Sequence, residues 1–561
     1  MIDFYTVKDF LWAKRGLVVF LFVIVFVLIH LPAIHFPYHQ DEYKWAEYVN
    51  PELNVPGRIP HPPVGEFVYS SFGLLVGYDN LRIVPLVFGL LNLVLLFILG
   101  GIVFEKRTAV WIISMFTISF YSLLASLMVD TDGAIMVFFF LFTAIFYYKW
   151  KEFNFIFKSK WLLLTFLVAI LGFLTKESFV LAIFAFALDF ALEKRIFEDR
   201  KKFLKYLLGG VFGVFILVFI LFLSTFVFPF KLEWFLLFLP RFFKFIDRGW
   251  FQTFIQLAKA VMYLSPLLVI PLVFIDREII RKTRPFILFI ITGLVFYLVL
   301  FDFSVGAIDR YLQFLIVPLC IISGAIFSKV FNIAGELKVK VKHVIGIIFL
   351  GALVFITQFF DHIVPSLYPK QGWISKATSF EWNFLFPFTG GSGPTGFYVS
   401  FLFIAILWIC SILLIIFALN KSNIKKEILF CVLILGILYN AVFIEEYLFG
   451  KINGSPYGLF MRAKEFIVNN KDISKIVVYN DIGGYDIRRM GLYERRLYAT
   501  PQFEAEYRNF FKNFSGQVLY IDIPRVQEKS FYSEYFLSCR NMYEKQDGYI
   551  SLKIFDCYKK Q

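Results

Sequence analysis

Charged residues are scarce in this chain of 561 residues, and apolar residues take their place. Charged side chains make up 17% of the sequence and hydrophobic ones 59%, whereas soluble proteins average about 25% and about 45–50%. This composition excludes a disordered chain, a fibrous protein and an ordinary water-soluble enzyme. With 76 Phe residues to cover, we predict an all-α polytopic membrane protein.

Cysteine is also rare, with five residues in the chain and no C-x-x-C or zinc-like spacing among them. Cys320, Cys410 and Cys431 lie in apolar runs and are interpreted as packing residues.

The net charge of +14 would suggest nucleic acid in a soluble protein. In a membrane protein the cationic residues collect in cytoplasmic loops instead. No nucleic-acid partner is therefore expected.

The apolar runs predict about thirteen transmembrane helices, each near the length of about 20 residues that a bilayer requires. They lie at 16–36, 83–104, 108–128, 132–148, 161–175, 177–192, 207–229, 254–275, 286–302, 311–328, 343–360, 397–419 and 427–448. With a cytoplasmic N-terminus, the inner loops hold more than twice as many Lys and Arg residues as the outer loops. This orientation in the cell membrane puts the C-terminal region outside.

The composition changes near residue 450, which predicts two domains: a transmembrane domain at 1–449 and a small extracytoplasmic α/β domain at 450–561. Strands are expected at 475–479 and 518–521, and helices at 458–469, 503–513 and 527–537. Cys539 and Cys557 flank a hairpin with Asp547-Gly548 at its turn, and an outside location permits a disulfide between them. We expect this domain to shape acceptor access rather than to carry the chemistry.

The outer loop at 37–80 places acids directly after the first predicted span. Asp41 and Glu42 lie there, with His61 in a His-Pro-Pro turn further along. Carboxylates at a membrane boundary cost desolvation energy unless water or partners compensate. Solvated loop acids are the simpler interpretation. Part of the loop is predicted to lie along the interface as amphipathic helices.

Two tight outer turns and one helix start carry further charges. Asp130 and Asp132 flank Thr131 in a short turn, where helix capping would explain one acid but not two. Lys176 lies in a turn against the positive-inside trend, as a headgroup-seeking side chain or as an anion site. Arg310 is either half of a surface ion pair or a phosphate ligand. Gathered at one membrane face, acids and cations indicate an enzyme with a lipid-phosphate substrate.

The order of these residues resembles a known superfamily. It comprises Asp41-Glu42, His61-Pro62-Pro63, Arg82 opening the second span, Thr131-Asp132 and Gly172-x-Leu174-Thr175-Lys176. The series resembles GT-C glycosyltransferases of the protein O-mannosyltransferase and lipid A aminoarabinose transferase type. Asp309-Arg310-Tyr311-Leu312 is similar to that family's Arg-Tyr-Leu-Pro stretch, although less closely.

The resemblance implies an inverting transfer of a sugar from a polyprenyl-phosphate carrier. Asp41 would be the general base, and Glu42 would position it. Asp132 would bind the acceptor or, with Asp41, a divalent cation, which the proposed reaction does not require. Donor phosphate would bind to Lys176, Arg310 and Arg82, while the pocket would be lined by His61 and Asp130.

Two other functions remain open alternatives. A multi-span transporter would show internal repeats or ionisable residues at the midplane, and Lys259, Pro266 and Pro271 are the residues that favour it. A lipid-glycan ligase would use a lipid-diphosphate donor. The sequence names neither the sugar nor the acceptor, which is a protein, a lipid or a glycan. It also leaves open the carrier length and which of Asp130 and Asp132 is functional.

Overall fold

A computed structural model describes residues 15–39, 41–53, 61–227, 249–301, 308–332, 341–388, 396–420, 425–480, 482–499 and 503–558. The chain divides into two compact units, and each is described by itself. Unit 1 contains Met1–Leu31, Tyr48–Lys338 and Asn423–Leu429. Unit 2 contains Pro32–Glu47, Val339–Ser422 and Phe430–Gln561. The division at residue 450 stays a prediction.

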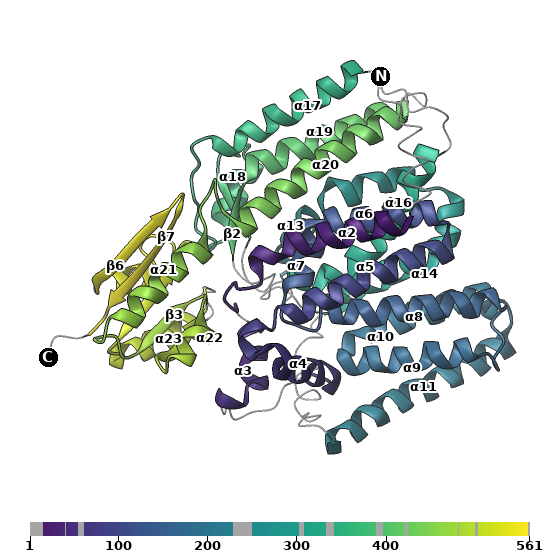
Figure 1. Cartoon of the computed structure of the whole chain (residues 1–561), viewed down its shortest axis with the longest axis horizontal. Coiled ribbons are helices and arrows are strands. Elements are labelled where there is room, and N and C mark those ends of the chain that lie inside the picture. Colours follow the sequence, from purple (N-terminus) through teal and green to yellow (C-terminus); the bar gives the residue numbers. More distant parts are fainter. Residues whose placement is uncertain are drawn as a thin grey trace. The chain divides into compact units, whose positions relative to one another are not determined.

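Unit 1 is built from helices. They are α2 (Arg15–His30), α4 (Pro63–Val76), α5 (Ile83–Val103), α6 (Lys106–Ile118), α7 (Phe120–Leu127), α8 (Ala134–Glu152), α9 (Lys160–Thr175), α10 (Val180–Glu193), α11 (Arg200–Val227), α13 (Trp250–Val269), α14 (Arg277–Val295), α15 (Ile308–Tyr311) and α16 (Ile316–Asn332). α8 packs against α5 and α9, and α10 packs against α14 (Figure 1). The predicted helical membrane class is confirmed.

Fewer helices are long enough to span a membrane than the thirteen predicted. Nine described helices are long and apolar enough to cross a membrane, and a bent pair would make ten. That pair is α6 and α7, which meet at 70°. α9, with 16 residues, and α10, with 14, reach only about 21–24 Å at 1.5 Å per residue, less than a bilayer core. The count of thirteen is therefore not confirmed.

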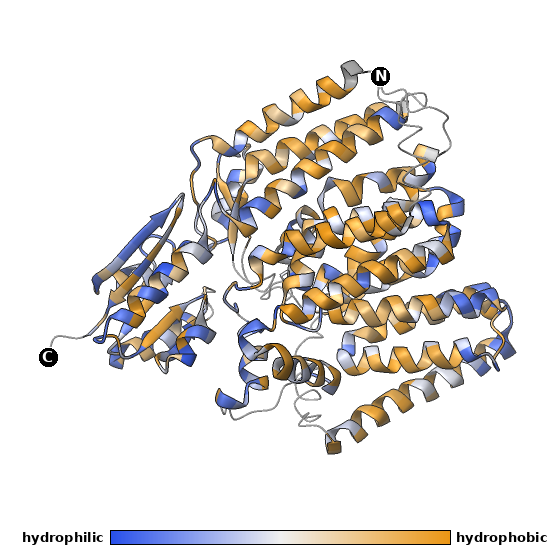
Figure 2. Ribbon diagram, viewed as in Figure 1, coloured by the Kyte–Doolittle hydropathy of each residue, from blue (hydrophilic) through white to orange (hydrophobic). Residues whose placement is uncertain are grey.

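The helices of unit 1 are hydrophobic along most of their length (Figure 2), and many of their large apolar residues are exposed. On α11, Phe212 is 65% exposed and Phe215 is 66% exposed. A water-soluble surface would not carry so many exposed rings in one helix, whereas lipid chains cover them without cost. Hydrophilic residues gather instead at the ends of several helices (Figure 2).

Close approaches at two glycines position the turn between α7 and α8 and the turn after α9. At Gly133, a Cβ atom would lie 2.4 Å from the carbonyl oxygen of Ala125, so only glycine allows the turn between α7 and α8 to fold back. At Gly172, a Cβ atom would lie 2.5 Å from the ring of Phe179. That ring packs on the end of α9 and fixes the turn that carries Lys176.

Unit 2 combines helices with two small sheets. Its helices are α3 (Asp41–Val49, of which the first seven residues belong to this unit), α17 (Val341–Ile356), α18 (Gln371–Thr378), α19 (Phe401–Asn420), most of α20 (Lys425–Leu448), α21 (Pro456–Asn469), α22 (Gly484–Arg489), α23 (Glu504–Asn513) and α24 (Phe531–Leu537). Strands β1 (Leu385–Phe388) and β2 (Phe397–Ser400) form an antiparallel pair. The predicted span at 397–419 thus begins as a strand and becomes helical at Phe401.

The C-terminal sheet has the strand order β4-β3-β5-β7-β6. Its strands are β3 (Ile476–Tyr479), β4 (Tyr493–Leu497), β5 (Gln517–Ile521), β6 (Arg540–Asp547) and β7 (Ile550–Asp556). β4, β3 and β5 are parallel, and β7 and β6 continue antiparallel. A disulfide joins Cys539 to Cys557 across the β6–β7 hairpin, with Cα atoms 4.7 Å apart. The small C-terminal sheet region is as predicted from the sequence.

Candidate functional site

The acidic turn between α7 and α8 is held in place by two buried side chains. The Tyr69 hydroxyl donates to the carbonyl oxygen of Asp130 at 2.9 Å. The Arg82 guanidinium, which is 0% exposed, donates to the carbonyl oxygen of Leu127 at 2.9 Å. Arg82 therefore braces this turn, and its role as a phosphate ligand stays a prediction.

Neither acid of the turn occupies the cap position of α8. The residue there is Gly133, which has no side chain to accept a capping hydrogen bond. Asp130 accepts from the backbone N–H of its neighbour Thr131, at 2.6 Å.

Two cations from distant elements converge on the acidic turn. Lys176, at the end of α9, lies 2.5 Å from Asp132 Oδ2. Arg310, on α15, lies 3.0 Å from Asp130 Oδ2 and 3.4 Å from Asp132 Oδ2. The ring of Tyr311 lies within 5.6 Å of the Lys176 ammonium and 4.9 Å of the Arg310 guanidinium. We call Asp130, Asp132, Lys176 and Arg310 the charge network.

The charge network is almost completely buried. Lys176 is 4% exposed and Arg310 is 8% exposed, so neither a headgroup-seeking lysine nor a surface ion pair describes them. Burial alone would lower the pKa of the Lys176 ammonium, but the carboxylates of Asp132 and Asp130 outweigh it and raise that pKa above its ordinary value. Lys176 therefore stays charged. Two acids balance two cations, and an anionic ligand would compete with the acids for them.

His61 lies beside the charge network. Its Nδ1 atom is 4.0 Å from Glu177 Oε1. Burial, and next the Lys176 charge, lower the pKa of His61 below its ordinary value, which keeps the imidazole neutral at neutral pH. Glu177 thus lies near His61, whereas Lys176 forms its ion pair with Asp132. The acid that follows Lys176 in the sequence is therefore not its ion-pair partner.

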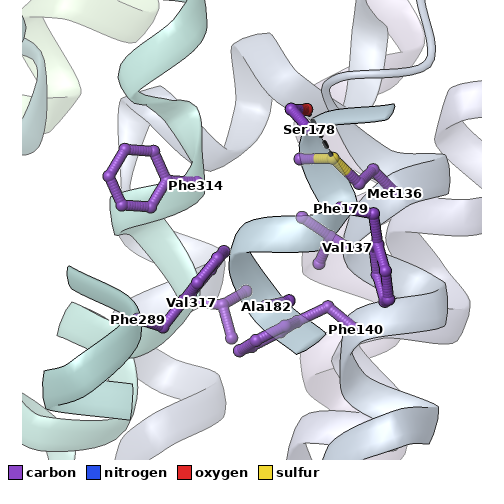
Figure 3. A pocket seen from close by; sticks show the side chains of 9 residues that line it. All are labelled: Met136, Val137, Phe140, Ser178, Phe179, Ala182, Phe289, Phe314 and Val317. Atoms are coloured by element: carbon purple, nitrogen blue, oxygen red, sulfur yellow. Dashed lines mark hydrogen bonds between the residues drawn. The ribbon is translucent and has the colours of Figure 1, made fainter. Parts of the chain in front are cut away.

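A small apolar pocket is lined by residues that follow the charge network in the sequence (Figure 3). Its cavity volume is about 10 Å³, room for roughly one water molecule. Its lining residues are Met136, Val137, Phe140, Ser178, Phe179, Ala182, Phe289, Phe314 and Val317. Met136 is four residues beyond Asp132, Ser178 two beyond Lys176 and Phe314 four beyond Arg310. Apolar side chains therefore follow the buried charges on three segments, an arrangement that suits an amphiphilic ligand.

Asp41 and Glu42 belong to unit 2 and differ in their surroundings. Glu42 is 3% exposed, and its Oε2 atom accepts from the backbone N–H of His39 at 3.0 Å. Asp41 has a side chain that is 38% exposed, and its Oδ1 atom lies 2.7 Å from Lys44 Nζ. Sequence reasoning missed Lys44, although its i,i+3 spacing from Asp41 on a helix was a usable signal.

The divalent-ion prediction for Asp41 and Asp132 is not tested by the structure. The two residues belong to different units, each of which is described by itself. Among the residues that the structure describes, no group of three or more His, Cys, Asp and Glu side chains is arranged to hold a metal ion.

Comparison with known proteins supports the predicted resemblance. Residues 60–224 match the model of the family described as dolichyl-phosphate-mannose-protein mannosyltransferase. A structure of ArnT from Cupriavidus metallidurans bound to undecaprenyl phosphate is similar with a TM-score of 0.54 at 13% identity, covering 98% of this chain and 100% of that one. Its apo structure gives a TM-score of 0.53 at 12% identity, covering 97% and 98%.

The family model and the ArnT structures support different conclusions. The family model covers less than half of the chain, and the identities to ArnT are low, so the ArnT comparison shows the fold. Comparison with curated proteins finds no match. The resemblance to GT-C glycosyltransferases of the mannosyltransferase and aminoarabinose transferase type is confirmed.

Proposed function

We propose that this chain, which has the fold of the ArnT structures, is an inverting glycosyltransferase that uses a polyprenyl-phosphate sugar donor at the extracytoplasmic face. The observation that carries the proposal is the buried charge network, in which two cations from distant elements converge on one acidic turn. A polyprenyl phosphate has an anionic head on an apolar chain, so the cations would bind the head while apolar helix surfaces and lipid accommodate the chain. Lys176 and Arg310 would bind the phosphate.

The reaction balances with the residues available. The acceptor oxygen or nitrogen attacks the anomeric carbon, and the bond from that carbon to the phosphate oxygen breaks. Asp41 takes the acceptor proton as general base, while Glu42 fixes the start of its helix. The polyprenyl phosphate leaves with an added negative charge, which Lys176 and Arg310 stabilise. In-line attack inverts the anomeric configuration.

The acids of the charge network keep the cations in place before the donor binds. Asp132 contacts both Lys176 and Arg310, so these side chains already point to one place. A bound phosphate would share these two cations with Asp132. Because both side chains are already ordered, binding would lose less conformational entropy. His61 and Asp130 would line the substrate site around the donor phosphate, with Arg82 supporting the turn. Asp132 is also the candidate contact for the acceptor.

The domain boundary at 449/450, the cytoplasmic N-terminus and the outer location of the C-terminal domain belong to this proposal. The acceptor remains a protein, a lipid or a glycan. A lipid-diphosphate donor is an alternative that the same cations would also bind. A transporter is favoured by Lys259, Pro266 and Pro271, and by the break in α13 at Ser265, where φ is 63°.

Mass spectrometry of lipids that co-purify with the protein tests the donor class. We expect a polyprenyl monophosphate in the wild type and its loss in Lys176→Ala. Lys202→Ala is the matched control, because Lys202 is an exposed lysine of α11 that pairs with Asp199 at 3.8 Å. With a polyprenyl-phosphate sugar and candidate acceptors, Lys176→Ala should lose turnover by about 10²–10³-fold. A lipid diphosphate in the wild type would favour the ligase. Equal lipid content and turnover in both variants would contradict the proposal.

A further inference from the structure

The segment that carries Asp41 is attached to the C-terminal sheet on its N-terminal side. His39 Nε2 lies 2.9 Å from the carbonyl oxygen of Asn480, and His39 forms an isolated antiparallel bridge with Ile482. Just before it, the ring of Tyr38 meets the ring of Tyr485 edge-on at 5.0 Å. Both His39 and Tyr38 are almost fully buried. All of these residues belong to unit 2.

Asn480 is itself held rigidly at the end of β3. Its φ of 54° is in the left-handed region, which Asn tolerates better than most residues. Its N–H donates to the carbonyl oxygen of Leu497 at 2.8 Å, and its side-chain amide donates to that of Ile523 at 3.2 Å. These bonds to neighbouring parts of the sheet aim the Asn480 carbonyl group at His39.

A second attachment lies beyond Asp41, on the same helix. Glu47 Oε1 lies 2.9 Å from Arg488 of α22, and the Glu47 side chain is only 7% exposed. The Arg488 guanidinium stacks over the ring of Tyr493 at 4.6 Å, and the hydroxyls of Tyr493 and Tyr43 are 3.5 Å apart. Arg488 therefore bonds to α3 while its own orientation is fixed by the first residue of β4.

Asp41 lies between the two attachments, and none of these contacts touches its carboxylate. It follows His39 by two residues and precedes Glu47 by six. Its side chain remains 38% exposed beside Lys44. The C-terminal domain thus fixes the backbone of the helix and leaves the proposed base accessible.

We infer that the C-terminal domain positions Asp41 for catalysis, with Arg488 acting through Glu47 and Asn480 through His39. This inference rests on the proposed function, in which Asp41 is the base. General-base catalysis depends on placement, and a displacement of about 1 Å can cost about 10²-fold in rate. Arg488 and Asn480 are positioning residues, because neither reaches the reacting atoms.

The test compares Arg488→Gln and Glu47→Gln in the full-length protein, with a polyprenyl-phosphate sugar as substrate. We expect kcat to fall by about 10–100-fold in each, with the KM for the lipid donor unchanged. Because the two side chains act through one contact, the double variant should be no slower than the slower single variant. Arg488→Lys should recover part of kcat. Arg462→Gln is the matched control, since Arg462 makes a half-exposed pair with Asp547 at 3.4 Å.

A thermal unfolding midpoint and a size-exclusion profile like those of the wild type check that each variant remains folded. Should Arg488→Gln fail this check, Glu47→Gln decides, because it alters α3 and not the domain. Wild-type kcat in the folded variants, or a change in donor KM alone, overturns the inference. Asp41→Asn distinguishes failure of the proposed function from failure of the positioning role. If this variant keeps full turnover, the assigned base is wrong. If it is inactive while the Arg488 and Glu47 variants are normal, only the positioning role fails.

Discussion

Lys176 Nζ lies 2.5 Å from Asp132 Oδ2, although the two residues are 44 positions apart in the sequence. The same carboxylate oxygen is 3.4 Å from Arg310. Asp132 is therefore the one acid in this network that contacts both cations, whereas Asp130 contacts Arg310. This difference separates two acids that the sequence presents as equivalent.

Asp132→Asn should destabilise the protein more than Asp130→Asn does. Loss of Asp132 removes the acid in contact with Lys176, whereas loss of Asp130 leaves both cations in contact with Asp132. Breaking a buried ion pair costs about 3–5 kcal/mol. Thermal unfolding in detergent, followed by size-exclusion chromatography, measures the difference. Glu152→Gln is the control, because Glu152 makes an exposed pair with Lys149 at 2.9 Å. Equal midpoints for the two Asp variants would refute the unequal roles.

Asp41→Asn should remove the general base while leaving the shape of the side chain nearly unchanged. Turnover should fall by about 10²–10⁴-fold, the usual cost of losing such a group. Binding of the polyprenyl-phosphate donor should survive, because the donor contacts are assigned to Lys176 and Arg310. Single-turnover kinetics and a lipid-binding assay measure the two effects. Near-full turnover in Asp41→Asn, together with inactivity of Asp132→Asn or Asp130→Asn, would move the base to the other loop.

His362 should make the protein less stable in mild acid. It is 5% exposed, and its Nε2 atom lies 2.7 Å from Ser400 Oγ. Burial lowers the pKa of His362 below its ordinary value of 6.5, and the weaker effects of the Phe360 backbone and of Asp361 do not restore it. Because the folded pKa is the lower one, stability present above pH 6.5 is lost as the pH falls through the folded pKa.

The unfolding midpoint at pH 7.5 and at pH 5.5 tests this expectation about His362. The wild type should lose more on acidification than His362→Gln, whose amide does not titrate. An identical acid shift in both proteins would exclude His362 as the source.

The proposed orientation predicts which loops reagents outside the cell can reach. A Cys placed at Ser530 should react with a membrane-impermeant maleimide in intact cells, and a Cys placed at Ser159 should react only after lysis. Ser530 precedes α24 of the C-terminal region, and Ser159 caps α9 at the end opposite Lys176. The reverse pattern would place the charge network on the cytoplasmic face.

The location of the helices in unit 1 was predictable because hydropathy reports burial in lipid directly. The two short runs were also located well: 161–175 lies within α9, and 177–192 covers a short turn at Glu177–Phe179 and most of α10. Hydropathy alone could not decide whether helices this short cross a bilayer. The 70° bend between α6 and α7 could not be predicted, because no Pro or Gly marks it in the sequence. Two hydroxyl-to-carbonyl bonds from Ser122, to Phe116 and Ser119, support the backbone there instead.

The charge network was predictable in composition because each member lies where polar residues are costly. Its pairing was not, since contacts such as Arg310 with Asp130 depend on how distant helices pack. Sequence reasoning missed β4, whose Tyr493–Leu497 stretch is rich in charge because it is an edge strand. It also missed Arg488, which looks like one surface cation among many until α3 is seen beside it.

The buried bond from Arg82 to Leu127 sets an order in which the protein is made. Arg82 leaves a ribosome 45 residues ahead of its carbonyl partner. Until that carbonyl group emerges, this bond cannot form, and burying a charge without its partners is costly. We therefore expect the Arg82 end of α5 to reach its final packing only after α6 and α7 are in place.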